Sequence, residues 1–286
     1  MTVNDYKKQF LNKLPEFYDN EERLYLFYIL MEEVMKFSKT DCILRGNDDV
    51  SIEKMEELDQ VLYRLQNSEP IQHIFEKAYF YGYEFKVSPA TLIPRRETEE
   101  LVEWVLSEMK NEPQKNWRVL DIGTGTGCIP ITIKKEFPLA VVSAIDVSVE
   151  ALKIAKENAV NLKTDVTFIK QDILKTQNLD GYDIIISNPP YVRNLEKTEI
   201  KNNVLHYEPH LALFVEDNDP LIFYRKITQL AQKSLTENGM LFFEINQYLG
   251  NEMNEMVSEY FNTVELRKDL QGNERMMKIK HSANSF

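Results

Sequence analysis

VLDIGTGTGCIP, residues 119–130, places a cluster of glycines between an apolar run and a helix-forming run. Glycine lets the backbone turn sharply and lets a ligand approach it closely, at the carboxyl edge of a parallel sheet. Asp146 ends the next apolar run, where a carboxylate can accept hydrogen bonds from both hydroxyls of a ribose. The stretch therefore predicts a strand, a ligand-binding loop and a helix that together bind a nucleoside.

The glycine spacing in this loop is G-x-G-x-G, which differs from the G-x-G-x-x-G of dinucleotide sites. Asp121 precedes the glycines, and a carboxylate there would repel a pyrophosphate and attract a cation. S-adenosyl-L-methionine carries an ammonium next to a sulfonium, so the loop favours this ligand over a dinucleotide. The alternative interpretation is a tight turn that binds nothing.

Strands and helices alternate on both sides of the loop. The predicted strands are 117–122, 140–146, 166–172, 182–188, 240–245, 263–269 and 274–280. The predicted helices between them are 97–110, 127–137, 148–162, 220–235 and 251–261. This alternation is typical of an α/β fold with a doubly wound, mainly parallel sheet, here of seven strands.

The first third of the chain predicts a separate helical module. One apolar stripe follows a possible N-cap at Asn20 and comprises Leu24, Phe27, Tyr28, Met31, Val34 and Met35. A second follows Ser51 and comprises Met55, Leu58, Val61, Leu62 and Leu65. The aromatic segment 77–94 has a turn at Gly82 and indicates a hairpin-like connector. We expect a helical domain at 1–75, a connector at 76–96 and the α/β domain at 97–286.

Composition limits the possible partners and the compartment. The 286 residues include 34 basic and 46 acidic side chains, and a net charge of −12 disfavours binding to a phosphate backbone. Two cysteines are too few for a disulfide framework, which favours the reducing cytoplasm. We find neither an apolar run of the ~18 residues a membrane helix needs nor a signal sequence. The histidines lack metal-ligand spacing, so no metal is expected: His73, His206, His210 and His281.

The second chemical motif is YDIIISNPPYV, residues 182–192. Proline has no amide donor, so Pro189 and Pro190 end the predicted strand in a rigid bend at the ligand-binding edge. The amide oxygen of Asn188 and a neighbouring carbonyl can accept both hydrogens of a planar NH2 group. Tyr191 offers a ring against which a flat amide or base can stack. The alternative interpretation is a simple Pro-Pro turn at the end of a strand.

Asn-Pro-Pro-Tyr resembles the signature of methyltransferases that act on planar NH2 groups. From about Pro70 to its end the chain further resembles the HemK/PrmC family. The motifs that carry this resemblance are, in chain order, YGYEFKVSP (81–89), TLIPRRETEELVE (91–103), DIGTGTG (121–127), SNPPYV (187–192), YEPHLALF (207–214) and DLQGNERM (269–276). Members of that family methylate the side-chain amide nitrogen of the glutamine in the Gly-Gly-Gln loop of peptide chain release factors.

The resemblance implies a Rossmann-like, class I methyltransferase fold that converts S-adenosyl-L-methionine to S-adenosyl-L-homocysteine. The residues it implies around the cofactor are Gly123, Thr124, Gly125, Thr126, Gly127, Asp146, Ile173 and Asn188. Those it implies around the substrate glutamine are Asn188, Pro189, Pro190 and Tyr191. It also implies that the N-terminal helices help to hold the release factor, and that Arg95 and Glu97 lie on a loop facing the cofactor cleft. We expect a cytoplasmic monomer that binds neither membrane nor nucleic acid.

Four positions depart from the family pattern. Ile173 stands where an aromatic residue is common, and Arg96 where proline is common. Glu76 and Asn246 stand where glycine is common. None of the four lies at a position implied to carry the methyl-transfer chemistry.

Three other functions compete with the preferred one. The first is methylation of an exocyclic amino group of adenine or guanine, which the negative charge and the lack of a basic stripe disfavour. The second is methylation of a ribosomal-protein glutamine, but RRETEELVE (95–103) resembles the release-factor branch. The third is a non-catalytic binding scaffold, which the intact Asn-Pro-Pro-Tyr disfavours.

Overall fold

A computed structural model describes residues 1–280, apart from the side chain of Asn202. The chain forms two compact units. Unit 1 comprises Met1–Glu76 together with Asn202–Tyr207, and unit 2 comprises Lys77–Lys201 together with the chain from Glu208 onward. A short segment from the second half of the sequence thus packs as part of the N-terminal unit.

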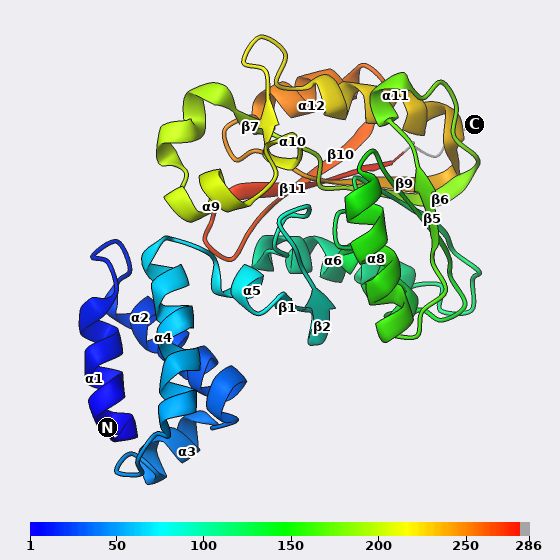
Figure 1. Ribbon diagram of the computed structural model, residues 1–286. Coiled ribbons are helices and arrows are strands. Elements are labelled where there is room, and N and C mark those ends of the chain that lie inside the picture. Colours follow the sequence, from blue (N-terminus) through cyan, green and yellow to red (C-terminus); the bar gives the residue numbers. More distant parts are fainter. Residues whose placement is uncertain (281–286) are drawn as a thin grey trace. The chain divides into compact units, whose positions relative to one another are not determined.

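Unit 1 is a bundle of short helices (Figure 1). Its elements are α1 (Val3–Lys13), α2 (Asn20–Leu30), the π-helical turn η1 (Met31–Met35), α3 (Lys39–Leu44), α4 (Ile52–Gln66), α5 (Ile71–Ile74) and α9 (Asn202–Tyr207). Tyr6, Phe10, Phe27 and Leu58 are fully buried in its core. Tyr207 of α9 joins this unit through its hydroxyl, which donates to the Asn67 carbonyl at 2.9 Å.

The structure corrects the predicted start and buried face of α2. Asp19 is the N-cap, because its side chain accepts from the Glu22 amide at 2.8 Å, so Asn20 is the first helical residue. Leu26 and Leu30 are buried where the stripe predicted Leu24 and Tyr28. Directly after Leu30 the helix continues as the π-turn Met31–Met35, which has more residues per turn, so one stripe of 3.6-residue period does not describe both segments.

The main sheet of unit 2 has seven strands in the order β10-β11-β9-β6-β3-β4-β5. Their bounds are β3 (Arg118–Ile122), β4 (Val141–Asp146), β5 (Thr167–Lys170), β6 (Tyr182–Ser187), β9 (Leu235–Glu244), β10 (Thr263–Lys268) and β11 (Glu274–Lys280). The pairs β3–β4, β3–β6, β4–β5 and β6–β9 are parallel, whereas β11 runs antiparallel to β9 and β10. This topology confirms the predicted doubly wound, mainly parallel sheet.

Helices cover both faces of the sheet (Figure 1). Side chains alternate along the strands, so Ile184 and Ile186 pack on one face and Ile185 on the other. The first face is covered by α6 (Arg96–Met109), α7 (Cys128–Glu136) and α8 (Val149–Asn161). The second is covered by α11 (Ile222–Ser234) and α12 (Gly250–Ser258). No described helix is both long and apolar enough to cross a membrane.

Small elements complete unit 2. The hairpin of β1 (Lys77–Phe80) and β2 (Tyr83–Lys86) turns at Tyr81 and Gly82, as predicted from the sequence. The remaining elements are η2 (Ile173–Lys175), β7 (Val192–Arg193), η3 (Asn194–Glu199), α10 (His210–Leu213) and β8 (Phe214–Val215). The segments that follow β2, β3, β4, β5 and β6 all lead to one pocket at the carboxyl edge of the sheet.

Candidate active site

The pocket at this edge has a volume of about 200 Å³. The residues that line it from the predicted site are Gly123, Thr124, Gly125, Thr126, Asp146, Ile173, Asn188, Pro189 and Pro190. Two of the predicted residues, Gly127 and Tyr191, lie outside this lining. The structure therefore brings the glycine loop and the Asn-Pro-Pro segment to the same cavity, although more than 60 residues separate them.

The glycine loop forms an open cradle at the pocket. Gly123 and Gly125 have φ values of +79° and +54°, a region that disfavours other residues. A Cβ atom at either position would meet no atom of the described chain within 4 Å, so its space belongs to the pocket. Gly127 has a different role, because a Cβ there would lie 3.0 Å from Ile131 Cδ1 and 3.1 Å from Ala155 Cβ. Its lack of a side chain permits α7 and α8 to pack closely.

Asp146 lies at the end of β4 with its carboxylate fixed by the backbone. Its Oδ2 accepts from the Gly125 amide and its Oδ1 from the Ser148 amide, each at 2.9 Å. Each carboxylate oxygen can accept a further hydrogen bond, so the side chain is oriented and still able to accept from a diol. Ile173 lies in η2, also lines the pocket and is 8% exposed. It offers an aliphatic surface to the pocket, at the position where the resemblance implies an aromatic residue.

Asp121 is a fully buried carboxyl at the start of the glycine loop. Neither of its side-chain oxygens has a hydrogen-bond partner among the described residues. Burial raises the pKa of Asp121 to about 7, and the charge of Asp146 adds to this, while Thr124 acts in the opposite direction. A cation in the adjacent pocket would stabilise the ionised form, because opposite charges attract strongly where water is excluded.

Asn188 lies immediately after β6, and the two prolines follow it. The strand end is held to its neighbour because the Ser187 hydroxyl donates to the Ile122 carbonyl at 2.7 Å. Asn188 Nδ2 donates to Thr98 Oγ1 at 3.2 Å. Pro189 is buried and Pro190 is half-buried, so the bend is supported by packing as well as by its fixed backbone angles.

Tyr191 points toward the interior. Its hydroxyl donates to Glu244 Oε1 at 3.0 Å, and its ring packs against the core between the sheet and α11. Burial raises the pKa of Tyr191 well above its usual range, and the neighbouring charge of Glu244 raises it further. The phenol therefore stays protonated and acts as a donor to Glu244.

Glu244 ends β9, is buried, and contacts Thr98 of the pocket lining. It accepts from Tyr191 and also from Thr98 Oγ1, the latter at 2.6 Å. Burial raises its pKa, while the two hydrogen bonds and the charge of Arg275 oppose that shift. The sequence motifs that carry the resemblance include Thr98 and Arg275, but no residue spacing indicated that both lie beside Glu244.

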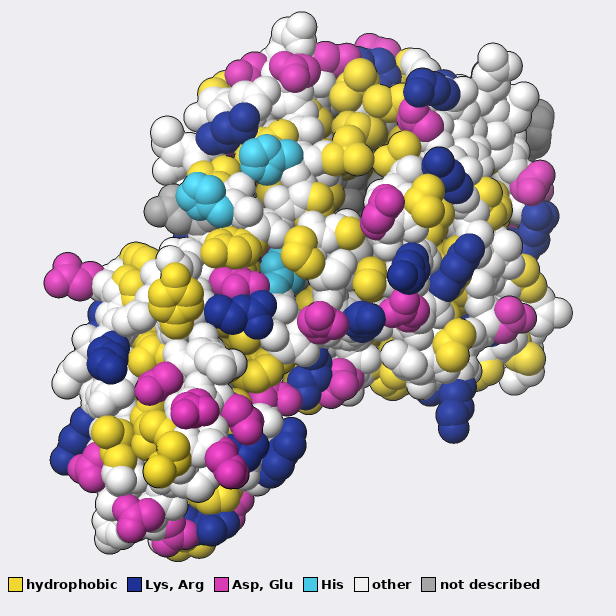
Figure 2. All heavy atoms as spheres, in the orientation of Figure 1, with side chains coloured by type: hydrophobic (Ala, Val, Ile, Leu, Met, Phe, Trp, Pro, Cys, Tyr) yellow, Lys and Arg dark blue, Asp and Glu magenta, His cyan; other side chains and the backbone are white. Residues whose placement is uncertain are grey.

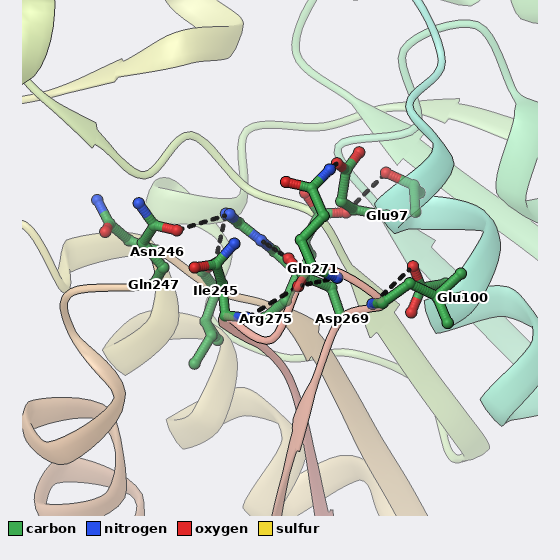
Figure 3. Close-up of polar contacts among 12 residues, drawn as sticks. Glu97, Glu100, Ile245, Asn246, Gln247, Asp269, Gln271 and Arg275 are labelled. Atoms are coloured by element: carbon green, nitrogen blue, oxygen red, sulfur yellow. Dashed lines mark hydrogen bonds and ion pairs between the residues drawn. The ribbon is translucent and has the colours of Figure 1, made fainter. Parts of the chain in front are cut away.

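The loop between β10 and β11 holds this end of β9. Figure 3 shows Arg275 between Asp269 and the strand end at Ile245 and Gln247. Its guanidinium donates to the Ile245 carbonyl and to Gln247 Oε1, at 3.4 and 3.3 Å, and pairs with Asp269 at 3.4 Å. Asp269 also accepts from the amides of Gln271 and Asn273 at 3.0 and 2.9 Å. The motif at 269–275 is therefore a hydrogen-bonded turn that positions a half-buried cation near Glu244.

A loop that joins β2 to α6 forms another wall of the pocket. Glu208, only 4% exposed, accepts from the Ile93 amide at 3.0 Å and pairs with Arg95. Arg95 lines the pocket, as the resemblance implied, whereas Glu97 accepts from Gln271 at 3.4 Å and is not part of the lining. Glu208 is thus a site-forming residue whose role the sequence alone did not indicate.

Asn246, where glycine is common, anchors the segment after the prolines. Its Nδ2 donates to the Tyr191 carbonyl at 3.0 Å and to Glu196 Oε2 at 2.9 Å. Glu196 in turn pairs with Arg193 at 2.5 Å. The side chain at 246 therefore stabilises the backbone that carries Tyr191.

Metal-binding groups are absent from the described residues: no three His, Cys, Asp or Glu side chains are placed to hold an ion. Of the histidines noted in the sequence, His281 lies outside the described residues. The remaining features suit an organic cation with a ribose. The open glycine cradle, the oriented Asp146 and the buried Asp121 together fit S-adenosyl-L-methionine.

Two known domain families match most of the chain. Residues 8–75 match the PrmC N-terminal domain, and residues 98–210 match the Methyltransferase small domain. A release factor glutamine methyltransferase of Flavobacterium psychrophilum is 50% identical, over 98% of this chain and 99% of its own. The protein of the same name from Bacteroides thetaiotaomicron is 43% identical, over 92% and 95%.

Among solved structures, the T. thermophilus 16S rRNA N2 G1207 methyltransferase in complex with AdoMet and guanosine has a TM-score of 0.52. It is 16% identical and covers 72% of this chain and 50% of its own, so it supports the methyltransferase fold alone. The relatives, by contrast, match nearly the whole chain at high identity. They confirm the resemblance seen in the sequence: this chain is a methyltransferase that belongs to the release factor glutamine methyltransferase family.

Proposed function

We propose that this enzyme transfers a methyl group from S-adenosyl-L-methionine to the side-chain amide nitrogen of the glutamine in the Gly-Gly-Gln motif of a peptide chain release factor. The observation that carries this proposal is the orientation of Asn188 at the pocket. Its Nδ2 is engaged by Thr98, which leaves Oδ1 as the end that can accept from a substrate amide. The names of the relatives support the choice of release factors as substrate.

The cofactor, when bound, supplies an electrophilic methyl group on a sulfonium and leaves as S-adenosyl-L-homocysteine. The residues that would hold it are the glycine loop from Gly123 to Gly127, Asp146 at the ribose and Ile173 beside the adenine. Asp121 would favour a cationic ligand through its charge. Asn188 would contact both cofactor and substrate.

The chain's own contribution to methyl transfer is orientation. Asn188 Oδ1 would accept one hydrogen of the glutamine NH2 group and the Pro189 carbonyl the other, which directs the nitrogen lone pair toward the methyl group. The N–CH3 bond would form as the methyl group leaves the sulfonium sulfur, and the nitrogen would then release a proton to solvent. Orientation of this kind can supply roughly 7–11 kcal/mol of the barrier reduction.

The negative charge of the molecule favours a protein substrate over nucleic acid. On the face drawn in Figure 2, Asp and Glu side chains are interspersed with Lys and Arg side chains over both units. The face therefore carries both signs of charge, and the net charge of −12 of the whole chain would repel a phosphate backbone. We propose that residues 1–75 form the docking domain for the release factor, that the connector is 76–96, and that the enzyme acts as a cytoplasmic monomer.

The proposal is tested with Asn188→Ala and labelled S-adenosyl-L-methionine. The variant removes the acceptor and keeps the Pro189–Pro190 bend, so we expect a normal fold and a turnover reduced by about 100-fold. Mass spectrometry of the release factor reports methylation of its Gly-Gly-Gln glutamine. Label that enters nucleic acid instead of the release factor would contradict the substrate, and a near wild-type rate in the variant would contradict the role of Asn188.

A further inference from the structure

The amide of Asn188 can adopt two orientations that have nearly the same shape. A half-turn exchanges Oδ1, which accepts hydrogen bonds, with Nδ2, which donates them. Only one orientation presents an acceptor to a substrate NH2 group, because the other brings two donors face to face. An enzyme that relies on this amide therefore needs a neighbouring group that selects one orientation.

We propose that Thr98 is a positioning residue that selects the productive orientation of Asn188. In this proposal Glu244 sets the direction of the Thr98 hydroxyl, so that the hydroxyl accepts from Asn188. This inference rests on the proposed role of Asn188. Thr98 Oγ1 lies 2.6 Å from Glu244 Oε2 and 3.2 Å from Asn188 Nδ2. A hydroxyl carries one hydrogen, and here that hydrogen is donated to Glu244. Toward Asn188 the hydroxyl can then only accept, which requires Nδ2 at this position and directs Oδ1 away from Thr98.

Glu244 is placed to act as an acceptor toward Thr98. It lies at the end of β9 with 2% of its surface exposed, and a second hydrogen bond comes from the Tyr191 hydroxyl at 3.0 Å. Both carboxylate oxygens therefore accept in this geometry, Oε2 from Thr98 and Oε1 from Tyr191, which fixes the direction of the Thr98 hydroxyl hydrogen. Arg275 supplies the balancing positive charge, and Figure 3 shows it fixed between Asp269 and the end of the strand.

The geometry joins three segments that are distant in the sequence. Thr98 comes from the first turn of α6, Asn188 from the end of β6 and Glu244 from the end of β9. Thr98 and Asn188 both line the pocket. Within the described part of the chain, Asn188 Oδ1 makes no hydrogen bond, so it is available to a substrate.

Thr98→Val tests the inference, because valine keeps the shape of threonine and removes the hydroxyl. We expect kcat to fall about tenfold, the kinetic equivalent of one lost hydrogen bond. The affinity for S-adenosyl-L-methionine, measured by calorimetry, should change by less than about twofold. Thr98→Ser should restore kcat, and Thr98→Cys, with a weak acceptor, should be intermediate. Thr228→Val is the matched control, since Thr228 is likewise buried and its hydroxyl has no described partner.

A double-mutant cycle separates positioning from general damage. If Thr98 acts through Asn188, then Thr98→Val should have less than about a twofold effect on the residual rate of Asn188→Ala. Rates are divided by the folded fraction, measured by tryptophan fluorescence. Equal losses in both backgrounds, or a Thr98→Val rate within twofold of wild type, would overturn the inference.

The proposed function is tested separately, by measuring which acceptor the wild-type enzyme methylates. If the wild type methylates an NH2 group on another acceptor and no glutamine, the proposed function fails. The cycle can then be measured on that acceptor, so the positioning role of Thr98 is still decided.

Discussion

Asp121→Asn should stabilise the cofactor-free enzyme at pH 8 and have little effect on its stability at pH 4. The carboxyl is fully buried without a described hydrogen-bond partner, and its pKa is raised from 3.8 to about 7. A raised pKa means that the folded state prefers the protonated form, so the stabilisation is complete below pH 3.8 and is lost as pH rises through 7. The shift corresponds to a free energy on the order of 4 kcal/mol. Asparagine resembles the protonated acid and avoids that loss.

The assay is denaturant unfolding followed by tryptophan fluorescence. Trp104 and Trp117 are the two tryptophans of the chain, and both are buried in the core of unit 2, so the signal reports that unit. Asp183→Asn is the control, because Asp183 is buried but accepts from the Arg118 amide and the Thr236 hydroxyl. That substitution should destabilise at pH 8. The reasoning fails if Asp121→Asn is no more stable than wild type at pH 8, or if its effect is the same at both pH values.

Cofactor binding and two further substitutions, Asp146→Ala and Gly127→Ala, test the roles assigned around the glycine loop. Asp121→Asn should weaken binding of S-adenosyl-L-methionine at pH 8 even while it stabilises the free enzyme; calorimetry that shows tighter binding would contradict an electrostatic role. Asp146→Ala should weaken binding by about 1.5–3 kcal/mol with little change in kcat at saturating cofactor, and an unchanged affinity would refute its assignment to the ribose. Gly127→Ala should lower the free energy of unfolding by more than about 1 kcal/mol, because φ is +79° and Ile131 and Ala155 lie too close. Gly125→Ala is its comparison: equal destabilisation by both would argue against the packing role of Gly127.

The sequence predicted the sheet well because its signals are local. Each buried strand is a short apolar run, and each helix that follows has its own periodicity, so the alternation appears without tertiary information. The N-terminal unit was harder to predict. Its first helix has a capping box in which Thr2 and Asp5 bond reciprocally, a local signal that apolar periodicity does not capture. The π-turn after α2 has no side-chain cap hydrogen bond and so offers no comparable local signal.

The candidate site also has parts that local sequence predicts and parts that depend on the tertiary fold. Glycines that need positive φ and prolines that end a strand are visible one residue at a time, so the loop and the Asn-Pro-Pro segment could be predicted. The contact of Thr98 with Glu244 joins residues 146 positions apart, and nothing in either neighbourhood specifies the other. Such a pair becomes predictable only once the sheet order is known. That order places the ends of β6 and β9 side by side, with the first turn of α6 beside them.

The Asn-Pro-Pro-Tyr motif depends on residues outside itself. It supplies an amide and a rigid bend, but an amide alone does not define which end faces the substrate. The orientation depends on a hydroxyl from α6 and a carboxylate from β9, and the tyrosine of the motif contributes by donating to that same carboxylate. Tyr191 lies outside the pocket lining, and its hydroxyl supports Glu244, the carboxylate that orients Thr98. A chain that kept the four motif residues and lost Thr98 or Glu244 would retain the signature and lose the device that makes its amide an acceptor.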